Sequence, residues 1–326
     1  MGAQVRLVEG TALVRRGSDA LQVGGDPDHH VVLTGLSEPQ QAWLLRAARR
    51  ARPPSLDAAP AGEPAPSTVP PPGCEHLIAR LVAAGFATHA TRRSAAAPVP
   101  GARAPSVRID GLDAVTTAAA MILARVGVRH LDLRDRRPVD ASVQGTVSAS
   151  LWALPRPDAV RDMIVSLEPR ARVERLHGPD VVVVSRARHA DAAACGLLLV
   201  EDRRHLPVIL RERSIVVGPL VRPGRTPCAQ CLDLHLTDAD RSWPLLARQM
   251  DDWPLPAPPV AAIQVAALEV ARRVLSAPGG DPILGEPAGG DPAWSQVRVD
   301  ARGGIAVREV APHPRCGCGA AGDPFD

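Results

Sequence analysis

Four cysteines in two close pairs are the residues whose types and spacing point most directly to chemistry. Cys228 and Cys231 have Cys-x-x-Cys spacing, and Cys316 and Cys318 are separated only by Gly317 near the carboxyl terminus. Thiolates at such spacings bind zinc tetrahedrally, and a shell of four thiolates leaves no coordination position open for catalysis. We therefore predict one structural zinc ion bound by these four residues.

Two other interpretations of the cysteines stay open at this point. A redox Cys-x-x-Cys motif or four unconnected thiols would also account for them, although redox chemistry does not require the second pair. His235 and His313 lie near the two pairs in sequence and are alternative zinc ligands. Of the remaining cysteines, Cys74 and Cys195, the latter lies in ADAAACGLLLV, a segment typical of a buried helix. We expect Cys195 to be a packed, unreactive thiol rather than a nucleophile.

Composition and charge are those of an ordinary globular protein and do not point to a particular ligand. A chain of 326 residues is long enough for two domains, and a formal net charge of +3 spread along it does not indicate binding to nucleic acid or to an anionic membrane. The amino terminus has no apolar run of signal-peptide length, and no segment is apolar enough to span a membrane. We expect a cytoplasmic protein, whose clustered cysteines bind metal rather than form disulfides.

The first 95 residues are expected to form a small α+β module. Short apolar stretches separated by turn residues predict small antiparallel strands in the first 50 residues, ahead of and alongside a helix. Ser37 and Gln40 form a capping box that starts a helix, and residues 75–86 show the apolar spacing of a second helix. The Pro- and Ala-rich segment 51–73 predicts a loop between them. Strands with two short helices favour a winged-helix-like module at 1–95.

A second Pro- and Ala-rich run predicts a linker at 96–106, and the pattern beyond it changes to alternating strands and helices. The expected βαβ unit has strands at 107–110 and 130–135 around a helix at 114–127. Further strands are expected at 179–185, 207–210, 214–221, 295–300 and 304–310, and a long helix at 260–276. These elements predict that residues 107–326 form a doubly wound α/β domain with a mainly parallel sheet and a zinc clip.

The order of these features resembles the ThiF-type adenylating enzymes related to ubiquitin activators, and most of all the ThiF-like partners of YcaO cyclodehydratases. The resemblance is carried by VRIDGLDAVTTAAAMILARVGVRHLDLRDRRPVD, by GPLVRPGRTPCAQCLD and by HPRCGC. It implies that Gly111 lies in the phosphate-binding turn and that Asp135 meets the ribose hydroxyls of ATP. Homodimers are usual in the family, so the resemblance also implies a homodimer.

The sequence departs from the family pattern at the expected nucleotide site. Only the first glycine of the turn is present, and we expect Leu112 and Val115 to crowd the phosphates and Asp113 to repel them. The family's Asn and Arg fall on ASVQG at 141–145, and its later Asp falls among Arg186, Ala187 and Arg188. Asp140 is retained. These departures disfavour ATP as a ligand.

In the cyclodehydratase partners a winged-helix-like element captures the leader of a ribosomal precursor peptide. The resemblance therefore implies a non-catalytic scaffold that binds a leader peptide and presents it to a modifying enzyme in the biosynthesis of a modified peptide.

Two other functions remain as alternatives. One is an active adenylyltransferase for the carboxyl terminus of a peptide or sulfur carrier. The other is a DNA-binding regulator with Arg15, Arg16, Arg46, Arg49 and Arg50 as phosphate contacts, which the absence of a basic run on the second helix disfavours. A third interpretation gives residues 1–95 no ligand and has them only cap or dimerise the larger domain.

Overall fold

The computed structural model describes residues 5–8, 10–18, 20–50, 70–89, 104–251, 253, 255–277 and 291–320. The chain divides into two compact units, Met1–Ala95 and Ala96–Asp326. Most of the predicted loop at 51–73 and most of the predicted linker at 96–106 lie outside the described residues.

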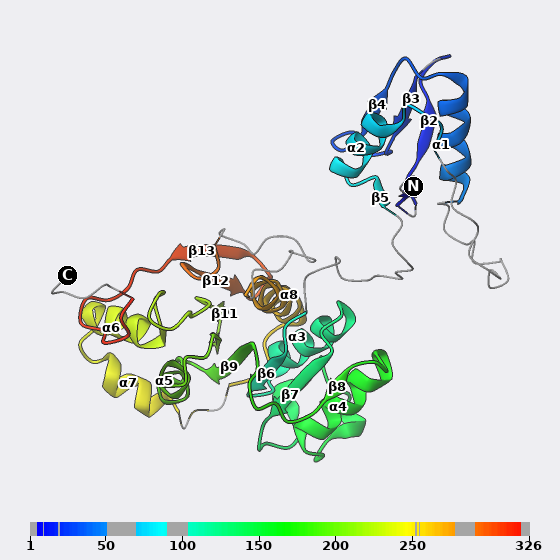
Figure 1. The fold of residues 1–326 in the computed structure, drawn as a ribbon. Coiled ribbons are helices and arrows are strands. Elements are labelled where there is room, and N and C mark those ends of the chain that lie inside the picture. Colours follow the sequence, from blue (N-terminus) through cyan, green and yellow to red (C-terminus); the bar gives the residue numbers. More distant parts are fainter. Residues whose placement is uncertain are drawn as a thin grey trace. The chain divides into compact units, whose positions relative to one another are not determined.

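The described residues of the smaller unit form two small antiparallel sheets and two helices (Figure 1). Strands β2, β3 and β4 form one sheet in that order, and β1 pairs with β5 in the other. The bounds are β1 Val5–Leu7, β2 Leu13–Arg15, β3 Leu21–Val23, β4 Val31–Leu33, α1 Glu38–Arg50, α2 Glu75–Ala83 and β5 Ala87–His89. The α+β composition matches the prediction, but the strand arrangement does not by itself identify a winged helix.

The core of the smaller unit comes from one face of each element. Trp43 and Leu44 of α1 pack with Leu21 of β3 and Leu81 of α2, all almost fully buried. Helix α1 starts at the predicted position, where the backbone N–H of Ser37 donates to Oε1 of Gln40 at 3.0 Å.

The larger unit is built on one mixed sheet of eight described strands, in the order β13-β12-β11-β10-β9-β6-β7-β8. The four pairs from β8 to β10 are parallel and the three from β10 to β13 are antiparallel. The bounds are β6 Val107–Asp110, β7 His130–Arg134, β8 Arg172–Val173, β9 Val181–Ala187, β10 His205–Leu210, β11 Ser214–Val217, β12 Ser295–Asp300 and β13 Ile305–Glu309. The prediction of a mixed α/β fold with a large, mainly parallel sheet is confirmed.

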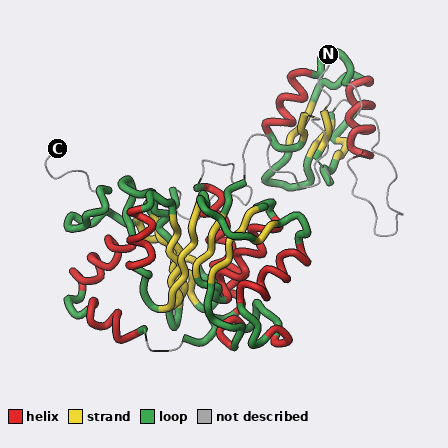
Figure 2. The backbone as a smooth tube through the Cα atoms, turned by 60° about the horizontal axis from the view of Figure 1, so that its bottom comes forward, coloured by secondary structure: helices red, strands yellow, loops and turns green. Residues whose placement is uncertain are grey.

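Helices cover both faces of this sheet (Figure 2). On one face lie α3 Ala114–Arg125, α4 Arg156–Leu167 and α8 Val260–Ser276, and on the other lie α5 Ala192–Val200 and α6 Ala229–Ala239. Helix α7, Trp243–Met250, contacts α6, and two short 3-10 helices occupy Ala141–Val143 and Ala149–Leu151. Valines of β9 are buried on both faces, as expected for a central parallel strand.

The strand expected at 214–221 ends at Val217. Gly218 has a φ of +94°, and Pro219 has no backbone N–H to continue the ladder.

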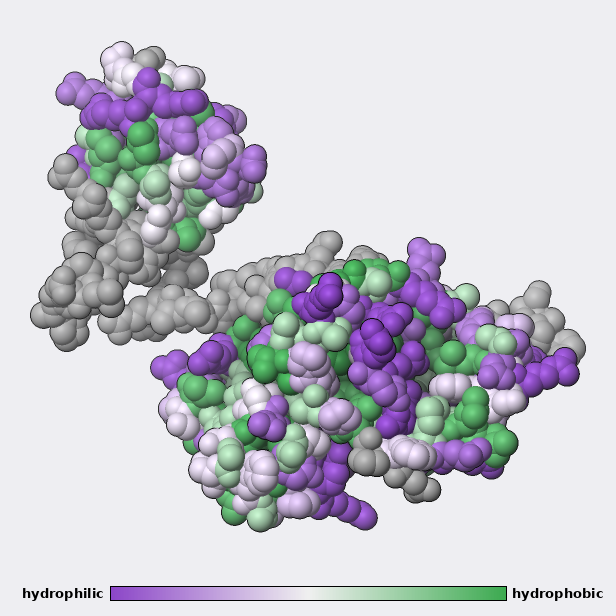
Figure 3. All heavy atoms as spheres, turned by 180° about the vertical axis from the view of Figure 1, so that it is seen from behind, coloured by the Kyte–Doolittle hydropathy of each residue, from purple (hydrophilic) through white to green (hydrophobic). Residues whose placement is uncertain are grey.

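No helix among the described residues is long and apolar enough to cross a membrane. On the face shown in Figure 3, hydrophilic side chains are interspersed with hydrophobic ones.

Candidate functional site

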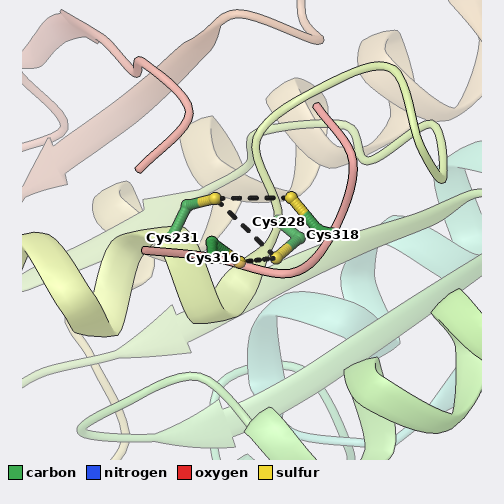
Figure 4. A group of neighbouring side chains, drawn as sticks. All are labelled: Cys228, Cys231, Cys316 and Cys318. Carbon is green, nitrogen blue, oxygen red and sulfur yellow. Dashed lines mark hydrogen bonds between the residues drawn. The ribbon is translucent and has the colours of Figure 1, made fainter. Parts of the chain in front are cut away.

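The four predicted cysteines come together at one point in the larger unit (Figure 4). Cys228 immediately precedes α6 and Cys231 lies in its first turn, whereas Cys316 and Cys318 come from the segment after β13. The Sγ atom of Cys228 lies 3.9 Å from that of Cys231 and 3.6 Å from that of Cys316. The Sγ atom of Cys231 lies 3.6 Å from that of Cys318. A tetrahedral zinc ion with Zn–S bonds of about 2.3 Å separates its sulfurs by about 3.8 Å. The four sulfurs are therefore placed to bind a metal ion such as zinc.

The two nearby histidines have other partners. His313 is buried, its Nδ1 accepts from the backbone N–H of Arg315 at 3.1 Å, and its Nε2 lies 2.8 Å from Asp238. His235 contacts the carbonyl oxygen of Ala311 at 2.9 Å through Nε2. The described cluster of possible metal ligands contains the four cysteines and neither histidine. The segment that carries Cys316 is thus held by side chains of α6 as well as by the sulfur cluster.

Cys195 is buried against Val182, Val184 and Leu198, as the sequence led us to expect. Burial raises the pKa of its thiol to about 12, with Asp191 adding to the effect. A thiol with this pKa is protonated at neutral pH, so Cys195 is not prepared to act as a nucleophile.

The turn after β6 requires glycine at its first position. Gly111 has a φ of +92°, and a Cβ atom there would lie 2.6 Å from the carbonyl oxygen of Ser185. Leu112 and Val115 are fully buried in the core beneath α3. The expectation that these two side chains crowd a phosphate site is therefore wrong, because both point inward.

Asp113 occupies the amino terminus of α3. Its Oδ1 accepts from the backbone N–H groups of Val115 at 2.8 Å and Thr116 at 3.1 Å, and its Oδ2 accepts from the hydroxyl of Ser185. Burial raises the pKa of the Asp113 carboxyl, which these hydrogen bonds partly oppose. Two of the backbone donors that a phosphate would use at this helix amino terminus, those of Val115 and Thr116, already have a partner.

Asp135 also has internal partners. It accepts from the backbone N–H of Leu112 at 2.7 Å and from the backbone and guanidinium of Arg137, with an ion pair of 2.7 Å. Burial opposes ionisation of this carboxyl, but the hydrogen bonds from Arg137 and Leu112 outweigh it and lower its pKa. The side chain is only 4% exposed. Asp135 thus connects the end of β7 to the turn that begins at Gly111.

Arg156 is a central residue of this site that the sequence did not reveal. Its guanidinium is 1% exposed, donates to the carbonyl oxygens of Leu112 and Pro138, and contacts Asp140 at 2.8 Å and Ser142 at 2.7 Å. The partners come from separate turns, and no local pattern around residue 156 marks it. Arg156 therefore holds the turn after β6 against the segment after β7.

A second group of ion pairs lies near the carboxyl end of β9. Arg186, just inside the end of β9, contacts Asp191 at 2.8 Å and Asp251 at 3.0 Å. His189 reaches the same Asp251 at 2.8 Å. Hydrogen bonds from Arg186 and His189 lower the pKa of the Asp251 carboxyl against a smaller opposing effect of burial, Arg186 contributing most.

These groups line a cavity of about 470 Å³ at the carboxyl ends of β6 and β9, the point where strand order reverses. Its lining carboxylates outnumber its guanidiniums by four to three. They are Asp113, Asp140, Asp191 and Asp251, and Arg137, Arg156 and Arg186. Each of the three arginines forms an ion pair within the described residues. The cavity therefore has the place of a nucleotide site but no uncompensated cation among its lining residues.

The smaller unit offers an exposed strand edge. Strand β2 is at one edge of the β2-β3-β4 sheet, and its Val14 is 51% exposed. Strand β4 forms the other edge, where Arg80 of α2 reaches the carbonyl oxygen of Val32 at 3.4 Å. An edge strand with unpaired backbone groups and an exposed apolar side chain can accept an extended peptide as a further strand.

No protein-family profile and no curated protein sequence matches this chain. Solved structures do resemble it. The crystal structure of Escherichia coli MccB with AMPCPP and MccA superposes with a TM-score of 0.61 at 15% identity, covering 97% of this chain and 99% of that one. The Microcin C7 biosynthetic enzyme MccB with N-formylated MccA gives 0.59 at 16% identity and the same coverage. PaaA gives 0.56 at 13% identity, covering 92% of this chain and 98% of that one. At these identities the chain shares its fold with MccB and PaaA, along almost the whole length of each.

Proposed function

We propose that this protein is a non-catalytic ThiF-like scaffold that binds the leader of a precursor peptide and presents it to a cyclodehydratase-type modifying enzyme. One observation carries the proposal: the amino terminus of α3, where the fold would receive a phosphate, holds the Asp113 carboxylate. Anion binding at this terminus would have to displace a side chain that is itself well hydrogen-bonded.

The surrounding charges add to this argument. Asp135, which the family resemblance assigns to the ribose of ATP, is 4% exposed and bonded to Leu112 and Arg137. A triphosphate would enter a cavity with an excess of carboxylates, which costs free energy unless cations compensate for it. The polar groups that would contact a nucleotide form ion pairs with one another instead.

The peptide-binding part of the proposal rests on the smaller unit and on the neighbours. MccB has been solved with MccA, with MccA derivatives and with ATP. The present chain shares that fold over 97% of its length, and its smaller unit offers the β2 edge with Val14 exposed. We propose that the leader pairs with β2, and that the cysteine cluster binds a structural zinc ion in the other unit.

Peptide binding is tested with a labelled precursor peptide encoded beside the gene for this chain, by fluorescence anisotropy without ATP. We expect binding, and we expect Val14→Asp to weaken it at least tenfold because a charge at the β2 edge disfavours an apolar strand. Val165→Asp is the matched control, since Val165 is 43% exposed on α4 of the other unit. Equal loss in both variants, or no loss in either, would contradict binding at β2.

The adenylating alternative is tested by ATP–pyrophosphate exchange with the same peptide. The proposed scaffold gives no exchange above the background without protein. Exchange that depends on both the peptide and the protein would show an active adenylyltransferase and refute the non-catalytic function. The reconstituted modification reaction then tests presentation: wild type should stimulate the modifying enzyme and Val14→Asp should not.

A further inference from the structure

A cleft rich in arginine lies at the amino ends of the central strands of the large sheet, where β9 and β10 begin. It has a volume of about 400 Å³, and its lining includes four arginines and two aspartates. These are Arg203, Arg204, Arg222, Arg225, Asp180 and Asp202. The cleft is separate from the cavity at the carboxyl ends of β6 and β9, because the two lie at opposite ends of the same strands.

The charges of this cleft are not balanced by its own lining. Asp180 accepts hydrogen bonds from the backbone N–H and the hydroxyl of Ser106, both at 2.7 Å. Arg222 reaches Asp291 at 3.7 Å. In the part of the chain that the structure describes, Arg203, Arg204 and Arg225 form no ion pair. Guanidiniums gathered in this way repel one another, so an anion between them is favoured.

The turn that carries Arg203 and Arg204 is held firmly. At the end of α5 the backbone N–H of Asp202 donates to Leu199 and that of Arg203 donates to Leu198, which is a Schellman motif. Asp202 has a φ of +51°, a left-handed conformation that normally favours glycine. The carbonyl oxygen of Arg203 also lies 2.9 Å from Nδ1 of the buried His205.

The second pair of arginines is fixed by a turn that leads into the cysteine cluster. Thr226 closes this turn, because its N–H donates to the carbonyl oxygen of Arg222 and its hydroxyl accepts from the N–H of Arg222 at 2.7 Å. A Cβ atom added at Gly319, next to Cys318, would lie 3.5 Å from the Cα of Gly224 at the tip of the turn. The arginine turn therefore lies close to the segment that carries Cys316 and Cys318.

We propose that this cleft binds a diphosphate group, either as inorganic pyrophosphate or as part of a nucleotide. A guanidinium presents paired donors that match phosphate oxygens in a bidentate way. Two separate turns each contribute a pair of guanidiniums, which suits two adjacent phosphate groups better than one. The cleft volume lies within the range of small-molecule sites.

The test is calorimetric binding of inorganic pyrophosphate to the full, zinc-loaded chain at low ionic strength. We expect wild type to bind and Arg203→Gln and Arg225→Gln each to weaken binding by roughly tenfold to hundredfold, the effect of losing a charged hydrogen bond. Arg241→Gln is the matched control, because Arg241 is exposed and forms no ion pair in the described part of the chain. ADP is titrated in parallel: tenfold tighter binding than pyrophosphate identifies a nucleotide, and equal binding identifies free diphosphate.

Three results would overturn the proposal. They are an absence of pyrophosphate binding by wild type, equal binding by wild type and Arg203→Gln, and binding of an oligoglutamate peptide without binding of pyrophosphate. Pyrophosphate binding to this cleft does not depend on the proposed scaffold function. ATP–pyrophosphate exchange would refute the scaffold function, whereas calorimetric binding of pyrophosphate tests the cleft. ATP binding that Arg203→Gln abolishes belongs to this cleft and not to the turn after β6.

Discussion

Replacing Asp113 with alanine tests whether this carboxylate fills the amino terminus of α3. The change removes hydrogen bonds to the N–H groups of Val115 and Thr116, and loss of an N-cap side chain costs about 0.5–2 kcal/mol. Ser185 loses one partner but keeps a contact with the carbonyl oxygen of Val208 at 3.4 Å. Loss of the Ser185 hydrogen bond adds about 0.5–1.5 kcal/mol to the cost. Relief of burying a charged group offsets part of this total, so we expect a net destabilisation of about 1–2 kcal/mol.

For a domain of this size the change lowers the unfolding midpoint by roughly 2–8 °C. Scanning calorimetry of the zinc-loaded chain measures the shift, and Asp162→Ala is the control, because Asp162 is 74% exposed on α4. The control should change stability by less than about 0.5 kcal/mol. An Asp113→Ala protein as stable as the control would refute the capping role and, with it, the argument that phosphate donors are already used.

Asparagine at position 113 separates capping from charge. Asn caps helices about as well as Asp, so Asp113→Asn should retain most of the stability that alanine loses. The folded-state pKa of Asp113 is raised by burial, so the stability it contributes is present at acid pH and declines as pH rises through that pKa. The Asn variant has no such decline, and its stability relative to wild type should increase from acid to neutral pH.

Three further predictions concern other parts of the molecule. Cys228→Ser should reduce bound zinc from about one ion per chain to a small fraction and expose the segment after β13 to protease, whereas Cys74→Ser should keep its zinc; metal analysis and limited proteolysis check both. Asp202→Gly should stabilise the chain by up to about 1 kcal/mol in thermal unfolding, because glycine adopts the left-handed conformation at φ +51° without strain. Duplex DNA should show no mobility shift even at low salt, and a salt-sensitive shift would favour the DNA-binding alternative.

The sequence predicts those features that depend on local patterns. Apolar runs mark β9 and the long helix at 260–276, and the spacing within each cysteine pair is enough to mark metal ligands. The meeting of Cys228 with Cys316 across 88 positions follows from the resemblance and the chemistry of zinc rather than from periodicity. These features can be predicted because they depend on residue type and local spacing alone.

The orientation of side chains in the turn after β6 could not be predicted in the same way. The positions of Leu112 and Val115 in a motif predict that they face a ligand, yet both are in the core. The chain turns at Gly111, whose φ is +92°, and the side chains of the residues after it enter the core. The burial of Arg156 has a similar origin, since its partner Leu112 lies 44 positions away and offers only a backbone carbonyl oxygen.

The site after β6 illustrates how a fold can keep its shape without a ligand. A nucleotide site needs backbone donors and cations that are free until the ligand arrives, and such groups destabilise the empty protein. Here Asp113 takes the donors at α3, and Asp135 and Asp140 take the cations Arg137 and Arg156. This network gives the polar groups of the turn internal partners and stabilises the turn. Among the described residues, three arginines without an ion pair lie instead in the cleft where β9 and β10 begin.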